Sequence, residues 1–163
     1  MLDPPSKYFR LCPQKEVRLK GAYYIKYASH ETDENGNITA VHCTYDPESY
    51  GGDTKDGRKV KGTLHWVNAN NCINAEVRLY DRLFNVPNPS DEERVTSFAD
   101  NLNPDSLKIL NGCKLDKSLG GVKAGDTFQF MRQGYFCVDT DSTADRLVFN
   151  RTVALKDSFA KKA

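Results

Sequence analysis

The chain is patterned as a series of short strands separated by turns. Apolar and aromatic residues alternate with polar ones in brief runs, which is typical of strands with one buried face. The densest runs, FQFM, GYFCV and RLVFNRTVAL, lie between 126 and 158 and are broken by Gln133-Gly134 and by DTDSTAD. This stretch predicts a β-hairpin followed by one more strand.

Further strands are expected upstream. The run VRLKGAYYIKYAS (17–29) alternates as one extended strand with a bulge or bend at Gly21, and Asn35-Gly36 then marks a hairpin with a type I′ turn. The runs KVKGTLHWV (59–67), EVRLYDRLF (76–84) and SLKILNGCKLD (106–116) predict three more strands. Closely spaced strands with tight turns predict a mainly all-β fold, a barrel or a sandwich.

The segment NVPNP (85–89) ends the strand pattern and predicts the internal boundary. A short connecting helix is expected after it, because Ser90 can serve as N-cap and Glu93 stands at the capping-box position. We therefore expect a first barrel at 8–86 and a second at 87–158. The opening MLDPPSKYF is unlike the start of a folded domain, so a fragment of a longer protein is expected.

Composition excludes several classes. The 163 residues suffice for one ordinary domain or two small ones, and no apolar run approaches the roughly 18 residues of a membrane span. No secretion signal is found, so a cytoplasmic, soluble protein is expected. The five cysteines are odd in number and lack a C-x-x-C pair, which argues against zinc and disulfides and predicts small buried hydrophobes.

Catalytic and metal motifs are not found. The histidines His30, His42 and His65 stand apart, without H-E-x-x-H, G-x-S-x-G or a Walker-type loop, so no catalytic residue is assigned. The DTDS run at 139–142 lacks the glycine and distal glutamate of a calcium loop and predicts an Asx turn instead. No metal ligand is assigned either.

Basic residues gather near the start of the chain, although the net charge is only +1. Between Lys7 and Lys26 there are six basic residues and one acidic residue, Glu16. Such a stripe can steer a polyanion to one face, or can simply be a solvated strand face. Arginine and glutamine suit RNA in particular, because each can match the edge of an unpaired base with two hydrogen bonds.

Several short segments of the sequence resemble one protein family. FQFMRQGYFCVD followed by VFNRTVALKDS is similar to the C-terminal end of glutaminyl-tRNA synthetases. EVRLKGAYYIK (16–26), HCTYDPES (42–49), DGRKVKGTLHW (56–66) and EVRLYDRLFNVPNP (76–89) resemble consecutive pieces of the same family's anticodon-binding region. The resemblance implies a distal barrel at 8–86 and a proximal barrel at 87–158 that lacks its first strands. HIGH-like and KMSKS-like motifs are missing, so no cofactor is expected here, and ATP and Mg belong to the catalytic domain of a class I ligase.

The resemblance also implies partners and residue roles. The expected partners are the anticodon loop of a glutamine tRNA and the parent's catalytic domain, with no DNA and no membrane. Arg18 and Lys20 resemble residues at the first anticodon base, and Arg10 resembles the one that reads the third. Gln129 and Arg132 resemble those that hold the middle U. Possible further contacts are Lys7, Tyr8 and Lys15.

Departures from the family and other readings stay open. Lys20 stands where bacterial relatives have a second arginine, and Met131 stands where an acidic residue can occur. A lysine keeps the charge but loses the planar fork, so first-base contact could reduce to a phosphate. One alternative is the same region of a eukaryote-type glutamyl-tRNA synthetase. Another is a freestanding RNA- or protein-binding barrel, similar to a 5S-RNA-binding ribosomal protein.

Overall fold

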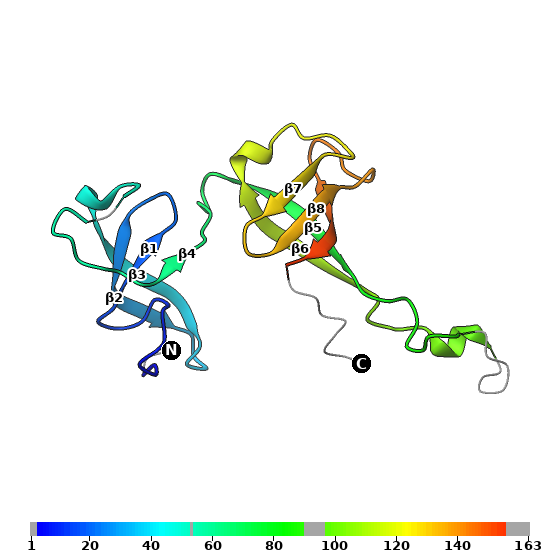
Figure 1. The fold of residues 1–163 in the computed structure, drawn as a ribbon, viewed down its shortest axis with the longest axis horizontal. Helices are drawn as coiled ribbons and strands as arrows, with labels where there is room; N and C mark the ends of the chain where they lie inside the picture. Colours follow the sequence, from blue (N-terminus) through cyan, green and yellow to red (C-terminus); the bar gives the residue numbers. More distant parts are fainter. Residues whose placement is uncertain (1–2, 53, 90–96, 156–163) are drawn as a thin grey trace. The chain divides into compact units, whose positions relative to one another are not determined.

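The computed structural model describes residues 3–52, 54–89 and 97–155. The chain forms two compact units, the first ending at Trp66 and the second beginning at Val67. Each is built on one β-sheet (Figure 1), so the prediction of a mainly all-β fold is confirmed. Among the described residues, no helix is long and apolar enough to cross a membrane.

The sheet of the first unit has four strands, in the order β3-β2-β1-β4. They are β1 (Glu16–Leu19), β2 (Tyr24–Thr32), β3 (Ile38–Asp46) and β4 (Thr63–Leu64), and a 3-10 turn, η1 (Pro47–Ser49), follows β3 (Figure 1). β1 pairs antiparallel with β2 and parallel with β4. The buried side chains under this sheet include Val17 and Tyr24. The strand predicted over 59–67 is thus reduced to two residues.

The predicted single strand over 17–29 is two strands. Gly21 has a φ of +70°, and the Ala22 amide donates to the carbonyl of Leu19 at 3.0 Å, so the chain reverses fully where only a bend was expected. Val17 and Tyr24 are then brought to the same core by antiparallel pairing of β1 with β2. Alternation alone could not distinguish a bend from a reversal, because both leave the flanking residues extended.

The hairpin predicted at Asn35-Gly36 is present, since β2 and β3 pair antiparallel on either side of it. Its turn differs from the predicted type I′, because Gly36 has a positive φ of +78° and Asn35 does not. The side chain of Asp33 explains the difference. One carboxylate oxygen accepts from the amides of Asn35, at 2.9 Å, and Asn37, at 2.8 Å, which closes a longer loop around an aspartate.

The second unit has a five-stranded sheet in the order β6-β5-β9-β8-β7. Its elements are β5 (Cys72–Tyr80), η2 (Phe98–Asn101), β6 (Leu107–Asp116), η3 (Lys117–Leu119), β7 (Thr127–Phe130), β8 (Gly134–Val138) and β9 (Leu147–Ala154). β7, β8 and β9 pair antiparallel in succession, which confirms the predicted hairpin and following strand (Figure 1). β5 pairs antiparallel with β6 and parallel with β9.

Aromatic rings fill the core of the second unit. Phe136 and Phe149 are buried, and Phe128 and Phe130 pack against them from β7. The rings of Phe130 and Phe136 stack with centroids 4.3 Å apart, and Phe130 lies 5.2 Å from Phe149. Because strand residues alternate between faces, this packing leaves Gln129 on the opposite, exposed face, as predicted.

The structure divides the chain earlier than the predicted boundary between 86 and 87. β5 belongs to the second unit because it pairs with both β6 and β9, so the units separate between Trp66 and Val67. The helix expected from Ser90, with Glu93, lies outside the described residues. The described 3-10 turn η2 follows it, with Ser97 as N-cap and Asp100 completing a capping box.

Candidate nucleic-acid interface

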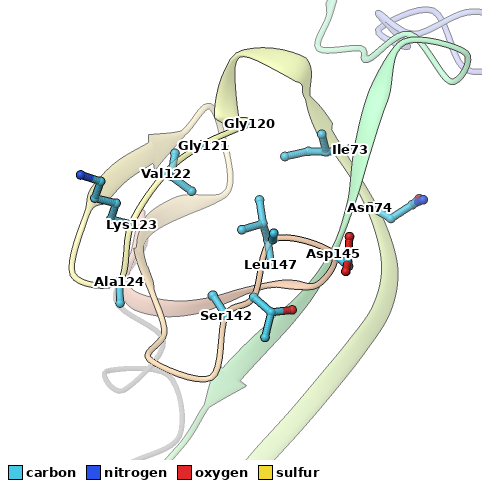
Figure 2. A pocket seen from close by; sticks show the side chains of 12 residues that line it. Ile73, Asn74, Gly120, Gly121, Val122, Lys123, Ala124, Ser142, Asp145 and Leu147 are labelled. Atoms are coloured by element: carbon cyan, nitrogen blue, oxygen red, sulfur yellow. The ribbon is translucent and has the colours of Figure 1, made fainter.

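A pocket of about 650 Å³ opens in the second unit, beside the first residues of β5 (Figure 2). Its walls are Ile73 and Asn74 of β5, the glycine-containing loop 120–124, and residues 142–145 with Leu147. Lys123 and Asp145 bring one charge of each sign. None of the predicted binding residues lines this pocket, so the predicted chemistry gathers elsewhere.

The first unit has a hollow of about 550 Å³ with a strongly basic lining. Five lining side chains are basic and one, Glu16, is acidic; we call this site the basic hollow. The basic residues are Arg10, Lys15, Lys26, Lys59 and Lys61. The hollow therefore unites three predicted residues, Tyr8, Arg10 and Lys15, with Lys26 of the basic stripe and with two lysines, at 59 and 61, that the sequence did not single out.

Close packing of three segments forms the basic hollow. The segment containing Phe9 passes over Gly62, where an added Cβ would lie 2.5 Å from the Phe9 carbonyl oxygen. The Lys61 ammonium lies 5.8 Å from the centroid of the Phe9 ring. The Lys15 ammonium donates to the carbonyl oxygen of Tyr8 at 3.3 Å, which fixes the turn between them. A side chain at position 62 would separate these segments.

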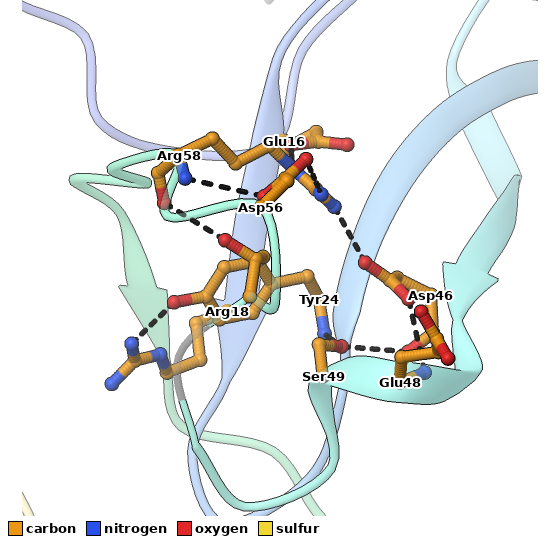
Figure 3. A network of polar contacts seen from close by, with 9 residues as sticks. Glu16, Arg18, Tyr24, Asp46, Glu48, Ser49, Asp56 and Arg58 are labelled. Carbon is orange, nitrogen blue, oxygen red and sulfur yellow. Dashed lines mark hydrogen bonds and ion pairs between the residues drawn. The ribbon is translucent and has the colours of Figure 1, made fainter.

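The acidic residue of the basic hollow, Glu16, pairs with Arg58, which also pairs with two other carboxylates (Figure 3). The guanidinium pairs with Glu16 at 2.9 Å, Asp46 at 2.7 Å and Asp56 at 2.6 Å. Hydrogen bonds to Asp46, then to Asp56 and Glu16, raise the pKa of Arg58. Hydrogen bonds from Thr54 and then Arg58 lower the pKa of Asp56 to about 2. Arg58 therefore serves the fold, and the lysines set the charge of the hollow.

Arg18 is partly engaged within the protein. Its guanidinium donates to the hydroxyl of Tyr24 and lies 4.9 Å from the centroid of that ring. Tyr24 is buried, and its amide donates to the hydroxyl of Ser49 at 2.8 Å (Figure 3). A cation over an aromatic ring is attracted to it, so this contact also fixes the direction of the arginine. Arg18 thus lies at a defined position in β1, half-buried.

Lys20 lies just beyond β1 and is exposed. Its amide donates to the carbonyl of Leu64 at 2.9 Å, and its own carbonyl accepts from the Trp66 indole at 3.0 Å. The backbone is held on both sides while the ammonium faces solvent. Lys7 is exposed as well and does not line the basic hollow. Of the predicted residues of this unit, Arg18, Lys20 and Lys7 therefore lie outside the hollow.

Gln129 and Arg132 lie on β7 and in the β7–β8 turn of the second unit. Both are exposed, and Arg132 has a left-handed φ of +63°. Gln129 is opposite Tyr135 in the register of β7 with β8, so the amide and the tyrosine are neighbours on one face. Sequence reasoning missed Tyr135; counting the two strands from the turn would have identified it. This face offers donors, an acceptor and an aromatic ring.

No group of three or more potential metal ligands occurs within residues 3–52, 54–89 and 97–155. The cysteines are unpaired with one another, but only Cys12 is buried, and Cys43 is exposed. The prediction of buried hydrophobes is therefore wrong for Cys43, whose strand β3 is exposed along most of its length. The Asx turn is confirmed, because the Asp141 amide donates to the Asp139 carboxylate at 2.8 Å.

The fold and the basic hollow define an all-β protein of two units, one of which presents a basic surface suited to a polyanion. Family models described as "tRNA synthetases class I (E and Q), anti-codon binding domain" match residues 3–46 and 63–139. The chain belongs to this family of class I synthetase anticodon-binding domains.

Curated relatives support the same assignment, and each is named "Glutamine--tRNA ligase". The chain is 56% identical over 157 residues to the protein of Vibrio parahaemolyticus, covering 96% of this chain and 28% of the relative. It is 51% identical over 160 residues to the protein of Pseudomonas putida, covering 98% of this chain and 28% of the relative. For Clostridium perfringens the identity is 51% over 163 residues, with 99% and 29% covered. The chain thus spans less than a third of the length of these relatives.

Proposed function

We propose that this chain binds the anticodon loop of a glutamine tRNA. The observation that carries the proposal is the basic hollow, which gathers Tyr8, Arg10 and Lys15 with three further lysines inside a family of anticodon-binding domains. Clustered positive charge attracts the phosphates of a loop, and the names of the relatives favour glutamine as the amino acid.

Phosphate binding and base reading are assigned to different residues. Lys15 and the other lysines of the basic hollow hold phosphates, while Arg10, at the same hollow, reads the third base. Arg18 and Lys20 lie along β1 and its end, at the first base. The support for Arg18 is its fixed direction over Tyr24, because a preordered arginine loses less entropy on binding. Lys20 contributes a positive charge but lacks the planar set of donors that an arginine would present.

The middle base is assigned to the second unit. Gln129 presents its amide on the exposed face of β7, where donor and acceptor can pair with the edge of an unpaired U. Arg132, in the adjoining turn, adds a charged donor fork, and Tyr135 offers a ring for stacking. Support for this assignment is the inward packing of Phe128 and Phe130, which leaves the polar side chain between them outward.

The test compares the middle-base preference of three variants. Stem-loops that differ only at the middle anticodon position are bound to Gln129→Ala, Arg132→Ala and Lys15→Ala. Loss of a good base contact should weaken binding of the cognate loop by about 1–3 kcal/mol. A loop with a wrong middle base should lose little further affinity in the same variant. Lys15→Ala should weaken every loop about equally, since phosphate contacts position without specifying. Full retention of the U preference in Gln129→Ala and Arg132→Ala would make the middle-base assignment wrong.

In this proposal the chain is one part of a longer enzyme. The parent attaches glutamine to its tRNA with ATP and Mg, and its catalytic domain is the second partner of these units. This chain would then contribute recognition, because its described residues provide base-reading and phosphate-holding side chains. Aminoacylation of glutamine and glutamate tRNAs by the parent distinguishes the two amino-acid specificities of the family.

A further inference from the structure

Three tyrosines form an aromatic cluster in the first unit, outside the basic hollow; Tyr23 is half-buried, and the other two are exposed. The ring of Tyr23 lies 5.1 Å from that of Tyr45, edge to face, and 5.1 Å from that of Tyr50, tilted. Tyr45 is 61% exposed and Tyr50 is 69% exposed. We call these three residues the tyrosine cluster. Rings so exposed contribute little to a core, and large exposed apolar groups that lie together mark binding surfaces.

The backbone beneath the tyrosine cluster is firmly held. The Gly51 amide donates to the Ala22 carbonyl at 2.9 Å, which joins the segment after Tyr50 to the turn before Tyr23. The Leu19 amide donates to the Tyr23 carbonyl at 2.9 Å and closes that turn. Tyr45 is in β3, opposite Ile25 of β2. Three rings on a fixed backbone are preorganised, so a ligand that stacks on them would order few groups.

The charges around the tyrosine cluster favour a polyanionic ligand. The exposed Lys20 belongs to the same turn as Tyr23. Of the acids next to Tyr45 and Tyr50 in the sequence, Asp46 pairs at 2.7 Å with Arg58, which it shares with Glu16 and Asp56, and Glu48 pairs with Lys55 at 2.7 Å. A nucleobase stacked on the rings would therefore place its phosphate near Lys20, and the carboxylates of Asp46 and Glu48 would each already be in an ion pair.

We propose that the tyrosine cluster is a stacking platform for unpaired bases of single-stranded RNA. The inference deepens the proposed function, on which it rests, by adding a base-stacking subsite beside Lys20 that is separate from the basic hollow. Aromatic rings stack every base, so this platform holds a loop nucleotide without reading its identity. A protein partner would also bury aromatic rings, but the flanking lysine and the paired acids fit a phosphate chain better.

The experiment measures binding of a glutamine-tRNA anticodon stem-loop and of an eight-residue oligouridylate to the full chain by fluorescence anisotropy. Tyr45→Ala and Tyr50→Ala should each weaken both probes about 5- to 150-fold, the range for loss of one base–aromatic stack. Tyr45→Phe and Tyr50→Phe should bind within about twofold of the wild type, because the ring is kept. Tyr80→Ala, an exposed tyrosine of the second unit, is the matched control and should bind normally.

Abasic probes test for the stack itself. Each loop nucleotide in turn is replaced with an abasic residue. At one position at least, the resulting loss of binding free energy should not be additive with the loss caused by Tyr45→Ala or Tyr50→Ala. Additivity at every position, or unchanged affinity in both alanine variants with native thermal melts, overturns the proposal. So does a change of oligomeric state in sedimentation with unchanged RNA affinity, which would assign the cluster to self-association. Weakened oligouridylate binding without any preference for the cognate loop would refute the proposed function and leave the stacking platform standing.

Discussion

The salt dependence of RNA binding is the most direct measure of the basic hollow. Its four lysines, Lys15, Lys26, Lys59 and Lys61, can each neutralise one phosphate, and the exposed Lys20 can neutralise a fifth. At about 0.7 per contact on single strands, the slope of log affinity against log salt is about −3.5. Between about 50 and 200 mM salt the affinity for the stem-loop should then fall about 100-fold.

The perturbation is the double substitution Lys59→Gln and Lys61→Gln, which removes two charges from the lining and leaves the carbonyls and amides in place. The slope should fall by about 1.4, to about −2, because two phosphate contacts are lost. Titrations by anisotropy at five salt concentrations measure it. The control is Lys108→Gln with Lys114→Gln, two exposed lysines of β6 in the second unit, and its slope should stay unchanged. A wild-type slope near zero, or equal slopes in the two doubles, would refute this reasoning.

Three further outcomes concern the scaffold. Phe149→Ala should lower the free energy of unfolding by about 3–5 kcal/mol in urea titrations, because the ring is fully buried; a change under about 1 kcal/mol would contradict its core role. Gly62→Ala should reduce the free energy of stem-loop binding by more than it reduces the free energy of unfolding, because the new methyl would lie 2.5 Å from the Phe9 carbonyl oxygen. Unchanged affinity would count against that packing. Hydrogen bonds, the largest from Thr54, lower the pKa of Asp56 to about 2, so Asp56→Asn should destabilise the fold above about pH 4. The difference in unfolding free energy between variant and wild type should vanish as the pH falls from about 4 to about 2. A constant difference in urea titrations across that range would contradict this prediction.

Local patterns predicted the second unit well from β7 onward. The strands there are short and separated by turn residues, and β7 alternates in burial, so the side chain of Gln129 could be assigned to the outer face and those of Phe128 and Phe130 to the core. These features depend on neighbours within a few residues. The Asx turn at Asp139 follows from the same local chemistry, since its carboxylate accepts from an amide two residues on.

The boundary between the units depends on contacts that no local pattern contains. β5 pairs in parallel with β9, which follows it by about seventy residues, and this pairing joins it to the second unit. β5 already ends at Tyr80, before NVPNP (85–89), and this proline-containing segment lies within the second unit. Proline and glycine mark where strands stop, while non-local pairing decides to which sheet a strand belongs.

The basic hollow shows the same limit at the level of charge. Counting basic residues between Lys7 and Lys26 identified a stripe, yet the structure divides that stripe among different places. Arg18 donates a hydrogen bond to Tyr24, Lys20 is exposed in the turn that precedes Tyr23, and Lys15 lines the hollow with Lys59 and Lys61 from another segment.

Arg58 explains how the basic hollow keeps its charge. This arginine stands in the same segment as Lys59 and Lys61, and from sequence it is an equally good phosphate ligand. In the fold its three ion pairs engage Glu16, Asp46 and Asp56, so its charge is already compensated. Within the described residues the structure records no ion pair for Lys26 or Lys59, and Arg58 compensates part of the charge of Glu16. The arginine thus reduces the negative potential that Glu16 adds to the hollow, without itself contacting a phosphate.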